Sequence, residues 1–91
     1  MDIKAFEKKA EILKALGHPT RLCIVKRLID RGGCNVSHMQ SCIGLPQSTV
    51  SQHISKLKAA GIIQGDRCGL EITYKVVDED AIKIIESLFN D

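Results

Sequence analysis

Apolar residues recur at intervals of three or four positions through most of this chain, a pattern that predicts amphipathic helices. The expected helices cover residues 2–16, 19–30, 35–43, 46–60 and 78–89. Glycines at positions 17, 32, 44 and 61 follow the first four, as expected of residues that end helices. In the first helix, Ile3, Phe6, Ala10 and Leu13 share one side, and in the fourth Val50, Ile54 and Leu57 do so.

The pattern changes from helical to alternating after residue 61. Ile62 and Ile63 indicate a short strand, and residues 66–69 a hairpin turn. A half-buried strand is expected to follow, with Leu70, Ile72, Tyr74 and Val76 inward. The predicted fold is therefore mainly α with a β-hairpin, in the order α-α-α-α-β-β-α. The length of 91 residues fits a single domain, residues 1–91.

Composition and charge narrow the class of protein. Hydrophobic residues make up 44% of the chain, yet no apolar stretch approaches the length needed to span a bilayer. The N-terminus has no hydrophobic signal-peptide core, so we expect a cytoplasmic protein that does not bind membranes. Residues 1–77 hold 12 Lys and Arg against 6 Asp and Glu, whereas residues 78–91 hold one Lys against 5 Asp and Glu. This asymmetry favours a nucleic-acid partner, although an ordinary solvated surface would also explain it.

The third and fourth predicted helices are joined by the short turn Gly44-Leu45-Pro46, which predicts a helix-turn-helix. The second helix of such a pair enters the major groove of DNA. Residues 46–60 suit that role because they carry small hydrogen-bonding side chains and lysines but no Asp or Glu. The alternative is an ordinary amphipathic surface helix. A hairpin directly after this helix predicts the wing of a winged helix-turn-helix.

These features give a predicted DNA-binding surface. Its residues on the fourth helix are Gln47, Ser48, Thr49, Ser51, Gln52, His53 and Lys56. Arg67 and Lys75 extend it along the wing. Gln and Ser or Thr can contact base edges, whereas Lys and Arg contact phosphates and add affinity without sequence information. His53 lies on the flank of the helix, where it either contacts a phosphate or packs against a neighbour.

The segments LKALGHPTRLCIVKRL, GLPQSTVSQHISKLKAAGII and GLEITYKV together resemble the ArsR/SmtB family of winged-helix transcriptional repressors. The resemblance covers residues 12–77. It implies a homodimer built from the first and last helices, with both recognition helices on one palindromic double-stranded DNA operator. It also implies repression that an inducer relieves.

The resemblance leaves the inducer open. Many members bind metal through Cys-x-Cys at the start of the third helix, where this chain has Asn35 and Ser37, and others use His and Asp on the last helix, which here has no His. We therefore expect no metal site and no cofactor, and a metal-responsive repressor with a non-standard site stays an alternative. Members that sense sulfane sulfur use a cysteine in the last helix, which is also absent here.

The four cysteines have no Cys-x-x-Cys spacing and are expected to be reduced in the cytosol. Cys34 and Cys68 are expected to be exposed, and they are the candidate thiol sensors of a redox-responsive repressor. Cys23 is expected to be half-buried, and Cys42 to lie in the core.

Two further classes of function were compared with DNA binding. No nucleophile-base pair, paired carboxylates or phosphate-binding glycine loop indicates an enzyme, so none is expected. A winged-helix protein-interaction module is the other alternative, because fold does not fix function. Such a module has less reason to keep carboxylates off its fourth helix.

Overall fold

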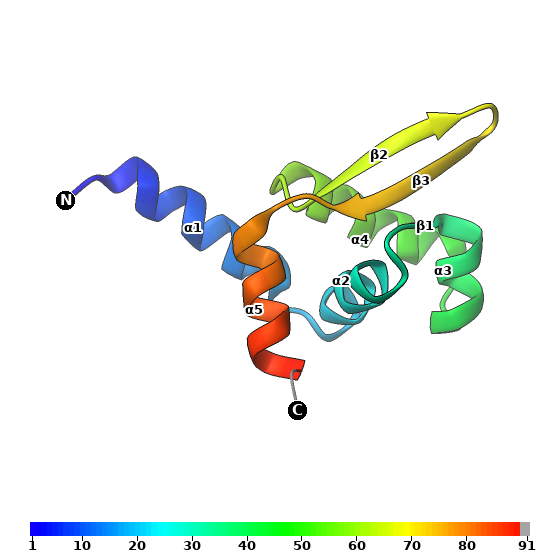
Figure 1. Ribbon diagram of the computed structural model, residues 1–91, viewed down its shortest axis with the longest axis horizontal. Helices are drawn as coiled ribbons and strands as arrows, with labels where there is room; N and C mark the ends of the chain where they lie inside the picture. Colours follow the sequence, from blue (N-terminus) through cyan, green and yellow to red (C-terminus); the bar gives the residue numbers. More distant parts are fainter. Residues whose placement is uncertain (90–91) are drawn as a thin grey trace.

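The computed structural model describes residues 1–89. Its helices are α1 (Ile3–Leu16), α2 (Pro19–Arg31), α3 (Val36–Ile43), α4 (Gln47–Ala59) and α5 (Glu79–Phe89). Its strands are β1 (Cys34–Asn35), β2 (Ile63–Cys68) and β3 (Glu71–Val76). The predicted winged helix-turn-helix fold is confirmed, with β1 as an addition. The hairpin of β2 and β3 projects away from the helices, and α1 extends from the opposite end (Figure 1).

Side-chain caps explain where several helices begin. The Nδ1 atom of His18 accepts a hydrogen bond from the backbone N–H of Thr20 at 3.1 Å, at the start of α2. The side chain of Asn35 accepts one from the N–H of His38 at 2.8 Å, so α3 begins one residue later than predicted. At the other end of α3, Gly44 has a φ of 78°, a left-handed conformation that glycine adopts at low cost.

The sheet has the order β1-β3-β2, and all its pairs are antiparallel. Strand β1 was not predicted, because two residues are too few to show an alternating pattern. Cys34 pairs with Tyr74 of β3, which places β1 between the hairpin and α3.

The hairpin is longer than predicted. Strand β2 continues to Cys68, so the turn lies at Gly69 and Leu70 and not at residues 66–69. The prediction that Leu70 faces the core is wrong, since its position in the turn leaves it 97% exposed. Tyr74, by contrast, is buried, as predicted.

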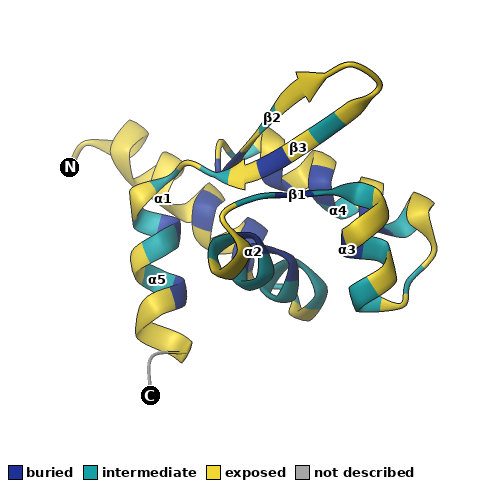
Figure 2. Ribbon diagram, turned by 45° about the vertical axis from the view of Figure 1, so that its right-hand side comes forward, coloured by how far each residue is buried: buried dark blue, intermediate teal, exposed yellow. Residues whose placement is uncertain are grey.

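The core lies between the helices and the base of the hairpin (Figure 2). Val50, Ile54 and Leu57 of α4 are buried, as the helical spacing predicted. In α1 the buried residues are Ile12, Ala15 and Leu16. The predicted apolar side of α1 instead faces solvent in the single chain, where Ile3, Phe6 and Leu13 are all more than half exposed. No helix within residues 1–89 is both long enough and apolar enough to cross a membrane.

Candidate DNA-binding surface

Helix α4 is held by its buried side and presents its polar side to solvent. The side chains of Val50 and Leu57 are fully buried, which fixes the rotation of the helix against the core. Among the predicted DNA-contacting residues of α4, the exposed ones are Gln47, Ser48, Ser51, Gln52 and Lys56. Thr49 and His53 are half-buried at the edges of this surface.

The N-terminus of α4 is open to a ligand. The residue before the helix is Pro46, and no side chain caps the first turn. Backbone N–H groups at an uncapped helix start carry partial positive charge and can bind a phosphate. The helix contains no Asp or Glu, and its last turn contains Lys56 and Lys58. The electrostatics of α4 therefore favour a polyanion along its whole length.

His53 is held in place by groups from α2 and its N-cap. Its ring lies 4.6 Å from the ring of His18, centroid to centroid, with the two planes tilted by 43°. A nitrogen of the Arg21 guanidinium lies 3.3 Å from Nδ1 of His53. Because an arginine can only donate, Nδ1 must accept, and the proton of the neutral ring is on Nε2. The Nε2–H group is then the donor left for another partner, such as a phosphate.

Burial and neighbouring charges both favour the neutral form of the His53 side chain. Burial lowers the pKa of His53 below its ordinary value, with smaller contributions from His18, Arg21 and Lys56. Arg21 was not among the predicted site residues. Its guanidinium also donates to the carbonyl oxygen of Ala15 at 2.5 Å, so it links the end of α1 to His53. The HPTRL segment could have suggested a role for this arginine, but not its partner 32 residues away.

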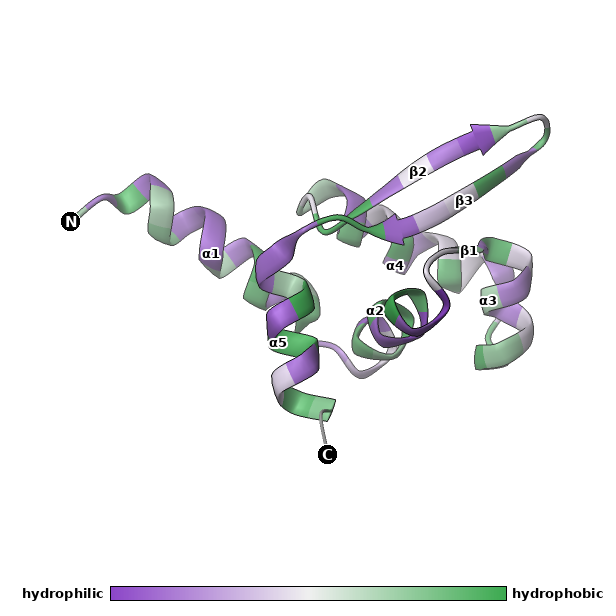
Figure 3. Cartoon of the chain, viewed as in Figure 1, coloured by the Kyte–Doolittle hydropathy of each residue, from purple (hydrophilic) through white to green (hydrophobic). Residues whose placement is uncertain are grey.

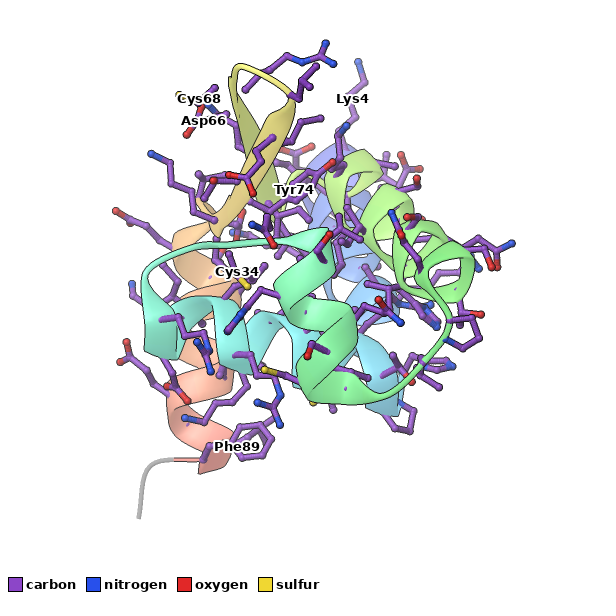
Figure 4. All side chains as sticks on the ribbon, turned by 90° about the vertical axis from the view of Figure 1, so that its right-hand side faces the viewer. Lys4, Cys34, Asp66, Cys68, Tyr74 and Phe89 are labelled. Atoms are coloured by element: carbon purple, nitrogen blue, oxygen red, sulfur yellow. The ribbon has the colours of Figure 1, made fainter. Side chains whose placement is uncertain are left out.

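The hairpin carries the two cations predicted for the wing. Arg67 and Lys75 are both exposed, and Lys75 forms an ion pair with Asp66 at 3.5 Å. Asp66 lies on the outer part of the hairpin, close to Cys68 (Figure 4). No ion pair involves Arg67 within residues 1–89. Arg67 is therefore the better candidate for a phosphate contact, because Asp66 partly offsets the charge of Lys75.

The base of the hairpin contacts the recognition helix. The ammonium of Lys58 lies 5.8 Å from the centre of the buried Tyr74 ring, a cation–π distance. Tyr74 lies opposite Gly65 of β2 in the strand register. This contact couples the direction of the wing to α4.

The structure corrects two predictions about the cysteines. Cys34 is buried and not exposed, because β1 places it beside β3, and its thiol donates to the carbonyl oxygen of Asn35 at 3.3 Å. Burial raises the pKa of the Cys34 thiol, which disfavours the reactive thiolate. Cys42 is half-buried and not in the core. Cys68 is exposed and Cys23 half-buried, as predicted.

Within residues 1–89, no group of three or more His, Cys, Asp or Glu side chains is arranged to hold a metal ion. The site therefore consists of a helix, α4, whose exposed polar side carries no Asp or Glu, and of the hairpin that follows it, which carries the exposed Arg67.

Comparisons with known proteins agree with this geometry. A model of a helix-turn-helix domain matches residues 16–65. The chain is 38% identical over 89 residues to an uncharacterised HTH-type transcriptional regulator of Methanocaldococcus jannaschii, covering 94% of this chain and 100% of that protein. The crystal structure of the transcriptional repressor PagR of Bacillus anthracis superimposes with a TM-score of 0.89 at 38% identity, covering 96% of this chain and 99% of PagR. HlyU from Vibrio cholerae gives a TM-score of 0.90 at 28% identity, over 99% and 96% of the two chains. This chain belongs to the ArsR/SmtB family of DNA-binding, winged helix-turn-helix transcriptional repressors.

Proposed function

We propose that this repressor acts as a homodimer whose two α4 helices bind one palindromic operator. The observation that carries the DNA-binding surface is the exposed, acid-free polar side of α4, with an uncapped N-terminus. Gln47, Ser48, Ser51 and Gln52 contact base edges, and Lys56 contacts the phosphate backbone. The Nε2–H group of His53 and the guanidinium of Arg67 add phosphate contacts on either side.

The dimer is supported by apolar residues that the single chain leaves exposed. On α1, Ile3, Phe6 and Leu13 are 52%, 61% and 57% exposed, and on α5, Leu88 and Phe89 are 61% and 45% exposed. Both helices carry hydrophobic residues along their length (Figure 3). Lys9 of α1 forms an ion pair with Asp80 of α5, so the two helices are joined at this end of the molecule. A second copy that covers these side chains removes apolar area from water.

The test is fluorescence anisotropy with labelled DNA from upstream of the protein's own coding region, at several salt concentrations. Binding should be sequence-dependent and should weaken steeply with salt, because each phosphate contact releases counterions. Binding to a protein partner that does not respond to salt, with no DNA binding even at low salt, would favour the interaction-module alternative.

We also propose that the repressor responds to thiol oxidation. The same anisotropy assay should compare reduced protein, peroxide-treated protein and protein with added zinc. Loss of binding only after peroxide supports a thiol switch. Loss only with zinc supports a metal-responsive repressor with a non-standard site.

A further inference from the structure

The side chain of Cys42 lies between two basic groups. A guanidinium nitrogen of Arg31, at the end of α2, donates to its sulfur at 3.8 Å. The Nε2 atom of His38, one turn earlier on α3, lies 3.8 Å from the same sulfur. Cys42 is half-buried, so a small reagent can reach it from solvent. Basic groups this close to a partly exposed sulfur stabilise the negative charge on it when it acts as a nucleophile.

Helix α2 adds a second thiol, that of Cys23, and a second arginine, Arg27. Interaction with Cys23, and more weakly with Cys42, raises the pKa of Arg27. The Nε atom of Arg27 is buried and has no hydrogen-bond partner within residues 1–89. We call Cys23, Arg27, Arg31, His38 and Cys42 the α2–α3 thiol cluster. The cluster therefore joins two thiols to three basic side chains.

We propose that Cys42 is the site at which peroxide-class oxidants modify this repressor. The Cys42 thiolate attacks one oxygen of the peroxide, an S–O bond forms and the O–O bond breaks. The sulfur is oxidised by two electrons to a sulfenic acid, the peroxide is reduced, and the departing hydroxide combines with the proton that the thiol released on ionisation to give water. The proposal rests on the thiol response proposed above and assigns it to a residue.

Two of the other cysteines, Cys34 and Cys68, have less suitable surroundings. Cys34 is only 8% exposed, and burial raises its pKa. Cys68 is exposed on the outer part of the hairpin (Figure 4). Accessibility alone would make Cys68 react first, whereas the contacts of the cluster make Cys42 react first.

Oxidation of Cys42 can reach the recognition helix through α3. Cys42 lies three residues after the buried Met39, which fastens α3 to the core, and two residues before Gly44, which begins the turn into α4. A sulfenic acid adds an oxygen atom where α2 and α3 meet and changes the contact with Arg31. Cys23 and Arg27 line a pocket together with Phe89 of α5, whereas Cys42, near the end of α3, is not among the residues that line it.

The first experiment measures which cysteine reacts. The reduced full-length chain is treated with limiting hydrogen peroxide and a dimedone trap, and labelling of each cysteine is followed by mass spectrometry. Cys42 should be labelled first, about tenfold faster than Cys68. Arg31→Gln should slow Cys42 labelling about tenfold, whereas the matched control Lys26→Gln, which removes a charge from the same helix, should not. Earlier labelling of Cys23 or Cys68, or no effect of Arg31→Gln, would overturn the assignment.

The second experiment measures the consequence for DNA binding. Peroxide should weaken operator binding of the parent and of Cys68→Ser about tenfold, and should leave Cys42→Ser unchanged. If peroxide weakens operator binding of Cys42→Ser as much as that of the parent, regulation does not act through this thiol. Circular dichroism of Cys42→Ser checks that this variant is folded. Arg31→Gln keeps the thiol, so its operator binding should also weaken with peroxide, but more slowly than that of the parent. If the reduced parent binds no DNA, the proposed operator binding fails, while the labelling experiment still decides the assignment of Cys42.

Discussion

At the scale of single residues, substitution of Gln52 best distinguishes the loss of a base contact from a change in the fold. Its side chain is exposed on the middle of α4. Gln52→Ala should weaken operator binding by about 1–3 kcal/mol and change sequence preference, as expected when a base contact is lost. Anisotropy with the operator and with base-substituted operators measures both effects.

The control for Gln52 is Gln64→Ala, which removes another exposed glutamine, from β2 and outside the predicted DNA-binding surface. It should bind the operator like the parent. If Gln52→Ala keeps the parent's affinity and sequence preference, Gln52 does not read a base.

His53 predicts a dependence of stability on pH. Its pKa in the folded chain is lowered from 6.5, mainly by burial, so the folded state takes up its proton less readily than the unfolded state. The stability that neutral His53 contributes is therefore present above about pH 6.5 and is lost as the pH falls through the lower, folded-state value. Urea unfolding between pH 7.5 and 5 should show a steeper loss in the parent than in His53→Gln.

The comparison variant for this pH dependence is His38→Gln, which removes an exposed imidazole and should keep the parent's slope. A slope equal in all three proteins would mean that His53 does not contribute to the pH dependence. The groups that face His53 are His18, Arg21 and Lys56.

The residues that sequence predicted well are those whose environment follows from local periodicity. Val50, Ile54 and Leu57 repeat at helical spacing, and the helix alone decides that they share a face. Cys34 and Leu70 were placed wrongly because their exposure depends on tertiary pairing. A two-residue strand buries Cys34, and the register of the hairpin puts Leu70 in the turn. The contact of Arg21 with His53 also joins distant positions, so spacing could not reveal it.

At the scale of elements, the direction of the wing depends on close packing at Gly65. A methyl group added there would lie 2.8 Å from Cε1 of Tyr74 and 2.9 Å from Cγ2 of Ile72. Gly65→Ala should therefore lower the free energy of unfolding by about 1–3 kcal/mol, because the ring of Tyr74 must move. Urea denaturation measures the change. The neighbouring change Gln64→Ala should have little effect, and equal stability of the two variants would show that the hairpin adjusts without cost.

At the scale of the whole molecule, charge and apolar surface are separated. The polar side of α4 carries no Asp or Glu, and the hairpin projects away from the end where α1 and α5 expose apolar side chains (Figure 3). Helix α5 has Glu79 and Asp80 in its first turn, and these would repel DNA if they lay beside the operator. In the proposed dimer, association through α1 and α5 would keep these acids away from the phosphates and leave both recognition helices free.

This arrangement predicts that Phe6→Glu disrupts the dimer, because it places a carboxylate in the apolar surface of α1. Sedimentation should give the parent a mass of twice 10.0 kDa and the variant a mass near 10.0 kDa. The matched control is Leu70→Glu, which changes another exposed apolar residue, 97% exposed on the wing, and should stay dimeric. Operator binding should fall in Phe6→Glu, because a single recognition helix contacts only one half-site. If Phe6→Glu sediments like the parent, α1 is not part of the interface, and the exposed residues of α5 must be tested instead.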